Sequence, residues 1–66
     1  MKIVLNGAPR DFADGATITV LLEAEALGNR RVAVEVNGAI VPRSQHGETR
    51  LADGDRVEIV HALGGG

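Results

Sequence analysis

Cysteine, tryptophan and tyrosine are all absent from this chain of 66 residues, and Phe12 is its only aromatic residue. Without cysteine, the fold has no disulfide to stabilise it and no thiolate to bind a metal. Without aromatic side chains, it lacks the residues that usually wall a deep ligand pocket. A chain this short also has a thin core, so size alone disfavours an enzyme with an enclosed active site.

Long apolar runs and an excess of positive charge are also missing. No run approaches the roughly 20 apolar residues that a membrane-spanning helix needs, and the apolar stretch within residues 1–7 is too short for a signal peptide. The net charge is −2 and the sequence pI is about 5.5, without the basic stripe that nucleic-acid binding calls for. These absences predict a cytoplasmic protein that binds neither membrane nor nucleic acid.

The first half of the chain predicts a hairpin followed by a helix. Residues 2–6 alternate as a short strand, and Asn6-Gly7 predicts a tight turn because both residues tolerate positive φ. A second strand is expected over residues 10–13. The helix begins after Thr17, which can cap it, and Gly28 suits the left-handed position that ends it. Its apolar stripe comprises Ile18, Leu21, Leu22 and Ala26.

The second half switches to an alternation of period two. Val32, Val34 and Val36 share one face of a strand, and Asn37-Gly38 predicts a hairpin into Ile40-Val41. Pro42 ends that strand or lies on an edge. Residues 49–51 are expected to pair briefly. The last strand, residues 56–63, has Val57 and Ile59 on one face and Glu58, Val60 and Ala62 on the other.

Hairpin, helix, hairpin and long final strand predict an α+β fold of the β-grasp (ubiquitin-like) type. One helix then covers one face of a mixed sheet of four to five strands, and the first and last strands lie parallel. Hydrophobic residues make up 44% of the chain, which is enough for one compact domain. The domain is expected over residues 1–63, with residues 64–66 as a flexible glycine tail.

Side chains that could perform catalysis do not form a recognisable set. Ser44 has no persuasive base and acid partners. His46 and His61, with Asp53 and Asp55, lack the ligand spacing of a zinc site. We interpret them as surface histidines and turn aspartates, and we expect no catalytic residue and no metal.

The sequence Gly64-Gly65-Gly66 directly follows the long apolar strand. Extended, three residues reach about 10 Å at roughly 3.3–3.6 Å each. Without Cβ atoms they can enter a slot too narrow for other residues. We expect this tail to be mobile and to deliver an unobstructed terminal carboxylate into the active site of another protein.

The chain resembles the thiamine-biosynthesis sulfur carrier family (ThiS) over essentially its whole length. The matching segments, in order, are residues 3–7 (IVLNG), 17–22 (TITVLL), 32–38 (VAVEVNG), 40–43 (IVPR), 51–60 (LADGDRVEIV) and 65–66 (GG). Two departures are small. An aromatic residue is common in the family where this chain has Gln45-His46, and Gly64 adds a third glycine to the required pair.

The resemblance implies a carrier that is modified by other enzymes and is not itself an enzyme. A ubiquitin-activator-like enzyme would use ATP to adenylate the carboxylate of Gly66. Gly64 and Gly65 would serve as the flexible segment that leads to it. Sulfur from a cysteine desulfurase system would then displace AMP and leave a thiocarboxylate for thiazole synthase. ATP belongs to the activating partner, and no cofactor is permanently bound.

Partners must bind the domain firmly enough to position its tail, and the sheet face away from the helix is the candidate docking surface. Val4, Val60 and Ala62 are expected there, with Leu63 at the root of the tail. Two alternatives stay open. One is a sulfur carrier for molybdopterin synthesis or tRNA thiolation, and the other is a β-grasp interaction module whose glycine end is incidental.

Overall fold

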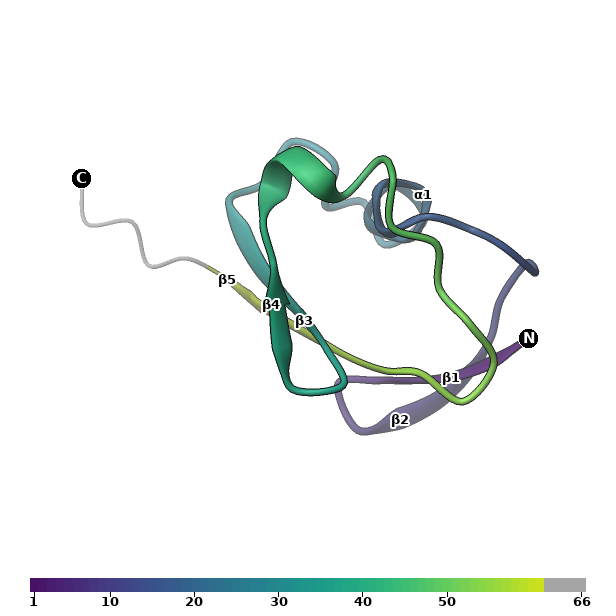
Figure 1. The fold of residues 1–66 in the computed structure, drawn as a ribbon. Helices are drawn as coiled ribbons and strands as arrows, with labels where there is room; N and C mark the ends of the chain where they lie inside the picture. Colours follow the sequence, from purple (N-terminus) through teal and green to yellow (C-terminus); the bar gives the residue numbers. More distant parts are fainter. Residues whose placement is uncertain (62–66) are drawn as a thin grey trace.

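The computed structural model describes residues 1–61. A short helix, α1 (Ile18–Ala24), lies over one face of a five-stranded sheet (Figure 1). The strands are β1 (Lys2–Leu5), β2 (Ala8–Asp11), β3 (Val32–Val36), β4 (Ala39–Val41) and β5 (Arg56–His61). A 3-10 turn, η1 (Arg43–Gln45), follows β4. This is the β-grasp arrangement that the order of the elements predicts.

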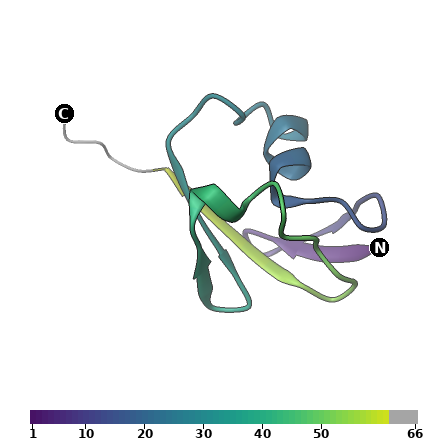
Figure 2. The same ribbon diagram turned by 45° about the horizontal axis from the view of Figure 1, so that its top comes forward.

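The order of strands in the sheet is β2-β1-β5-β3-β4. The first and last strands are parallel, with Val4 opposite Arg56 and Leu5 opposite Val57. On its other side β5 pairs antiparallel with β3. Figure 2 shows this sheet turned relative to Figure 1, with α1 clear of it on one side. The final strand therefore lies in the centre of the sheet, and the two hairpins supply its edges.

Both predicted hairpin turns are confirmed by their backbone angles. Asn6 and Gly7 have φ of 50° and 84°, and Asn37 and Gly38 have φ of 53° and 87°. A two-residue turn fixes the register of its strands. Leu5 is consequently opposite Ala8, and β2 occupies Ala8–Asp11 instead of the residues 10–13 that we expected.

Helix α1 begins as predicted and ends earlier than predicted. The side chain of Thr17 caps it by accepting a hydrogen bond from the Val20 N–H at 3.3 Å. At the other end Ala26, with φ of 60°, takes the left-handed position that we expected for Gly28. The Leu27 N–H bonds the Leu22 carbonyl at 2.7 Å, and the Ala26 N–H bonds the Glu23 carbonyl at 3.0 Å. These two bonds form a Schellman motif.

The early end of the helix also changes its apolar stripe. Ala26, predicted to face the core, is exposed, whereas Leu27 packs against the core. A contact between the residue after the left-handed position and the last helical turn commonly accompanies a Schellman motif. Leu27 makes the apolar contact that the sequence pattern attributed to Ala26.

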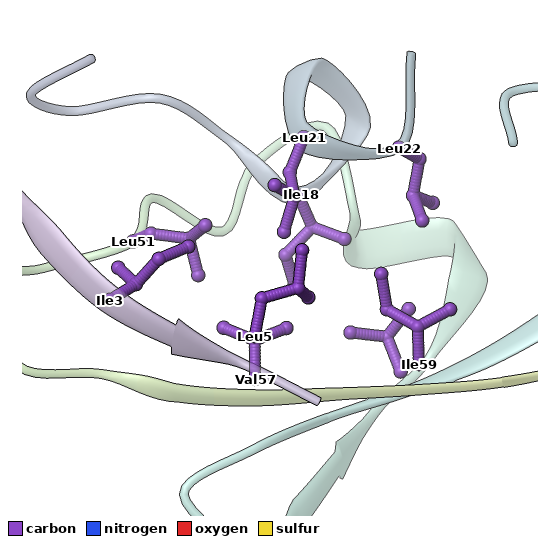
Figure 3. Packing of buried hydrophobic residues seen from close by; sticks show 9 residues of the cluster. Ile3, Leu5, Ile18, Leu21, Leu22, Leu51, Val57 and Ile59 are labelled. Atoms are coloured by element: carbon purple, nitrogen blue, oxygen red, sulfur yellow. The ribbon is translucent and has the colours of Figure 1, made fainter. Parts of the chain in front are cut away.

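The core lies between α1 and the sheet. Figure 3 shows Ile18, Leu21 and Leu22 above the strand residues that face them. The cluster comprises Ile3, Leu5, Ile18, Leu21, Leu22, Val34, Leu51, Val57 and Ile59. Leu51 belongs to this cluster but lies in a loop. The brief strand that we expected over residues 49–51 is only a single bridge between Thr17 and Arg50. Within residues 1–61, no helix is long and apolar enough to cross a membrane.

Candidate functional site

The described residues stop just before the predicted tail. Gly66, the predicted site of loading, lies outside them, as do Gly64, Gly65, Ala62 and Leu63. The structure describes the strand that leads to these residues. β5 is bonded along both edges, and its pairing with β3 continues to His61, which is opposite Val32. The tail sequence is therefore attached to the central strand of the sheet.

The beginning of β5 is fixed by the β3–β4 turn. The side-chain oxygen of Asn37 accepts a hydrogen bond from the Arg56 N–H at 2.9 Å, and its Nδ2 donates to Asp55 at 3.0 Å. Asp55 also accepts from the Ala52 N–H at 2.8 Å, and Asp53 accepts from the Lys2 N–H at 2.7 Å. Both aspartates lie at the turn before β5, as predicted; Asp55 satisfies a backbone donor of that turn, and Asp53 satisfies one in β1.

We call the sheet face opposite α1 the open face. Val4 is half-buried there and Val60 is 57% exposed, because the alternate residues of both strands turn toward α1. These predicted docking residues share a face without being neighbours. Val4 is opposite Arg56, four residues before Val60 on β5, which is about 13 Å at roughly 3.3 Å per residue. Arg56 and Glu58 lie in that interval.

Sequence reasoning missed the residues that do lie beside Val60. Ala33 is directly opposite Val60, and Ile40, which is 69% exposed, is opposite Glu35 on the same face. The turn at Asn37-Gly38 was a sufficient signal, because a two-residue turn places Glu35 across from Ile40. The open face consequently carries exposed aliphatic side chains near the end of β5.

His46 does not lie on the surface, contrary to our expectation. It is 6% exposed, and its Nε2 lies 3.0 Å from the Val41 carbonyl oxygen. Because a carbonyl only accepts, we assign the proton to Nε2. The 3-10 turn η1 brings the ring inward, and a polar loop sequence gives no sign of that turn. His61 is exposed, as predicted.

Hollows and reactive groups give no sign of an enclosed active site in residues 1–61. The hollow between α1 and η1, lined in part by Arg30, Arg43 and His46, measures about 150 Å³. Pockets for small-molecule ligands are commonly about 300–1,000 Å³ and mostly apolar. A second hollow, on the opposite face of the sheet, measures about 510 Å³ but is shallow and is lined only by charged residues, Asn37 and glycines. Ser44 is exposed in η1. Across the same described range, no three His, Cys, Asp or Glu residues come together as metal ligands.

The groups with a shifted pKa form two ion pairs. One lies on the side of the sheet that α1 covers, and the other lies at the amino terminus. Arg10 donates to Glu25 at 3.2 and 2.5 Å, which ties β2 to the end of α1. The hydrogen bond from Arg10 lowers the pKa of Glu25, and the reciprocal bond raises the pKa of Arg10. The Met1 amino group bonds Asp14 at 2.7 Å, which raises the pKa of the amine and lowers that of Asp14.

Known proteins match this chain over most or all of its length. The model of the ThiS family matches residues 3–66. A thiazole synthase of Paramagnetospirillum magneticum is 44% identical over 66 residues, and this chain spans 20% of that protein's length. The sulfur carrier protein ThiS of Bacillus subtilis is 43% identical over 53 residues, which cover 80% of each chain.

A solved structure resembles the fold closely. The crystal structure of the thiamine biosynthesis protein ThiS from Geobacter metallireducens superposes with a TM-score of 0.87. The two sequences are 35% identical, and the match covers 100% of each chain. Family model, curated relatives and solved structure agree with the segments noted in the sequence. This chain belongs to the ThiS family.

Proposed function

We propose that this chain is the sulfur carrier for the thiazole step of thiamine biosynthesis, and that Gly66 carries the sulfur as a thiocarboxylate. The observation that carries the proposal is the position of β5. The strand pairs with β1 at Arg56 and Val57 and with β3 up to His61, and the glycine sequence follows within a few residues. A tail attached to the centre of the sheet starts from a defined point, and its glycines can enter a narrow slot.

The proposed chemistry needs a partner because a carboxylate is a poor electrophile. A carboxylate oxygen of Gly66 attacks the α-phosphorus of ATP in an adenylating enzyme, and pyrophosphate leaves. Hydrosulfide, released from a persulfide by a thiol reductant of the donor system, then attacks the acyl carbon. AMP leaves with the bonding electrons, and loss of the S–H proton leaves the thiocarboxylate. The chain supplies the carboxylate and the surface by which it is held. The partner supplies ATP and the catalytic groups.

Thiazole synthase is the proposed sulfur acceptor, and a cysteine desulfurase system is the proposed ultimate donor. Support for the acceptor comes from the thiazole synthases that are similar to this chain along one fifth of their length. A carrier sequence within the same polypeptide as the synthase places donor and acceptor at high effective concentration.

Co-purification tests the choice of acceptor. We expect this protein to be retained by immobilised thiazole synthase from the same organism and not by the large subunit of a molybdopterin synthase. Selective retention by the molybdopterin synthase subunit would assign the chain to the other pathway. The adenylation step is followed separately, by pyrophosphate release from ATP in the presence of the adenylating enzyme. We expect release to require Gly66.

A further inference from the structure

Two glutamates lie directly opposite each other on the open face. Glu35 of β3 pairs in register with Glu58 of β5, and the neighbours Val34, Val57 and Ile59 are buried on the other side. Side chains opposite each other on adjacent strands have Cβ atoms about 4.5–5.5 Å apart, and like charges in that position destabilise a sheet. The domain thus carries a repulsive pair in the centre of its sheet.

No basic side chain of residues 1–61 forms an ion pair with either glutamate. The ion pairs of the described chain use Asp11, Asp14 and Glu25, and no basic nitrogen of the described residues lies within 4.0 Å of a carboxylate oxygen of Glu35 or Glu58. Arg56 lies on the same face, two residues before Glu58, and it also forms no ion pair there. Both carboxylates line a shallow hollow of about 510 Å³ together with Arg56, Asn37, Gly38 and Gly54.

Exposed aliphatic side chains border the two glutamates. Ile40 is opposite Glu35 on β4, and Val60 lies two residues beyond Glu58 on β5. They are 69% and 57% exposed and are, with Val20, the large hydrophobic side chains most exposed in the described chain. Complementary charges across an interface select the partner and steer its approach, and exposed aliphatic side chains beside them add apolar area that a partner can bury.

We propose that the Glu35–Glu58 pair receives a lysine or arginine side chain of thiazole synthase, with Ile40 and Val60 packing against apolar residues around that cation. This inference rests on the proposed function, because it assigns the open face to the protein that receives the sulfur. A cation between the carboxylates converts their mutual repulsion into two attractions. The two carboxylates therefore destabilise the free domain and stabilise its complex with thiazole synthase.

Removing one of the two glutamate charges should raise the stability of the free domain and weaken its binding to thiazole synthase. Glu58→Gln removes the repulsion and keeps the size of the side chain. We expect a higher urea midpoint for the free protein and a dissociation constant for thiazole synthase raised by about tenfold. The dissociation constant of the variant should also depend less on salt concentration. Glu35→Gln should act in the same way.

A double variant tests the repulsion itself. Either single substitution abolishes it, so Glu35→Gln combined with Glu58→Gln should raise the urea midpoint by less than the sum of the two single effects. The matched control is Glu23→Gln on α1, which makes the same change of charge on the covered side of the sheet. We expect that control to leave the affinity for thiazole synthase unchanged.

Binding is measured by titration calorimetry with thiazole synthase, and stability by urea unfolding of the free protein. If the native carrier binds and both glutamine variants bind equally well, the proposed cation contact is wrong. The same conclusion follows if Ile40→Ala weakens binding while neither glutamine variant does, because docking would then be purely apolar. If the native carrier itself does not bind thiazole synthase, the proposed acceptor is wrong instead.

Discussion

The side-chain oxygen of Asn6 accepts a hydrogen bond from the backbone N–H of Ile59 at 2.7 Å. β1 and β5 are parallel, and the Asn6 N–H donates to the Val57 carbonyl at 2.9 Å. In a regular parallel ladder, the next bond would run from the Ile59 N–H to the main-chain carbonyl of Asn6. The chain is already turning into β2 at Asn6, and the side chain takes the place of that carbonyl. This contact extends the support of β5 toward the tail.

We expect Asn6→Gly to destabilise the domain by about 1–2 kcal/mol, because the Ile59 N–H loses its acceptor. Glycine tolerates the φ of 50° at this position, so turn strain does not contribute. Hydrogen exchange should show faster exchange at Ile59 in this variant. Asn6→Asp keeps an oxygen acceptor and should preserve the protection of that amide. Equal protection in Asn6→Gly and the native protein would mean that the side chain is not the acceptor.

The left-handed residue at the end of α1 offers a stabilising substitution. Ala26 has φ of 60°, a conformation that costs a residue with a Cβ about 1–2 kcal/mol and glycine almost nothing. Ala26→Gly should therefore raise the free energy of unfolding by about 0.5–1 kcal/mol, after the greater flexibility of glycine in the unfolded chain is deducted. Ala24→Gly, within the helix, should lower it by about 1 kcal/mol. Urea unfolding measures both, and the same sign in both variants would contradict the Schellman ending.

Two apolar residues of α1 that are adjacent in sequence differ in burial. Leu21 is fully buried in the core and Val20 is 45% exposed. Leu21→Ala should cost about 2–5 kcal/mol, because it leaves a cavity between helix and sheet. Val20→Ala should change stability by no more than about 0.5 kcal/mol. Thermal or urea unfolding measures both, and a similar loss in both variants would show that the helix packs by a different face.

Acid stability should report the ion pair between Arg10 and Glu25. The hydrogen bond from Arg10 lowers the pKa of Glu25 in the folded protein. Its contribution is complete above the ordinary glutamate pKa of about 4.3 and is lost as the pH falls through the lower folded value. We expect native stability to fall more steeply below about pH 4.3 than that of Glu25→Gln. Glu48→Gln, at an exposed position, should follow the native curve. Parallel curves for Glu25→Gln and the native protein would contradict the pair.

The sequence predicted those features that depend on local chemistry. Asn6-Gly7 and Asn37-Gly38 predicted the turns because both residues of each pair tolerate positive φ, and Thr17 predicted the start of α1. The alternation from residue 56 predicted which side chains of β5 face the core. Together these signals were sufficient for the β-grasp topology.

The errors occur where contacts between distant segments decide the local structure. Leu27 packs against the core directly after a left-handed Ala26, so the helix ends there, although Gly28 is intrinsically better suited to that position. His46 is buried by η1 and bonded to the Val41 carbonyl, which no nearby sequence pattern indicates. Val4 and Val60 were placed correctly on one face, but only the strand register shows that Arg56 and Glu58 lie between them.

Intact mass spectrometry of the protein after incubation with the adenylating enzyme, ATP and sulfide tests the central claim most directly. The proposal predicts a mass increase equal to the replacement of one oxygen atom by one sulfur atom, located at Gly66 by fragmentation. Deleting Gly66, or adding an alanine after it, should abolish the increase and leave the unfolding curve unchanged. Sulfur incorporation that persists in either variant, or that lies elsewhere in the chain, would contradict the account.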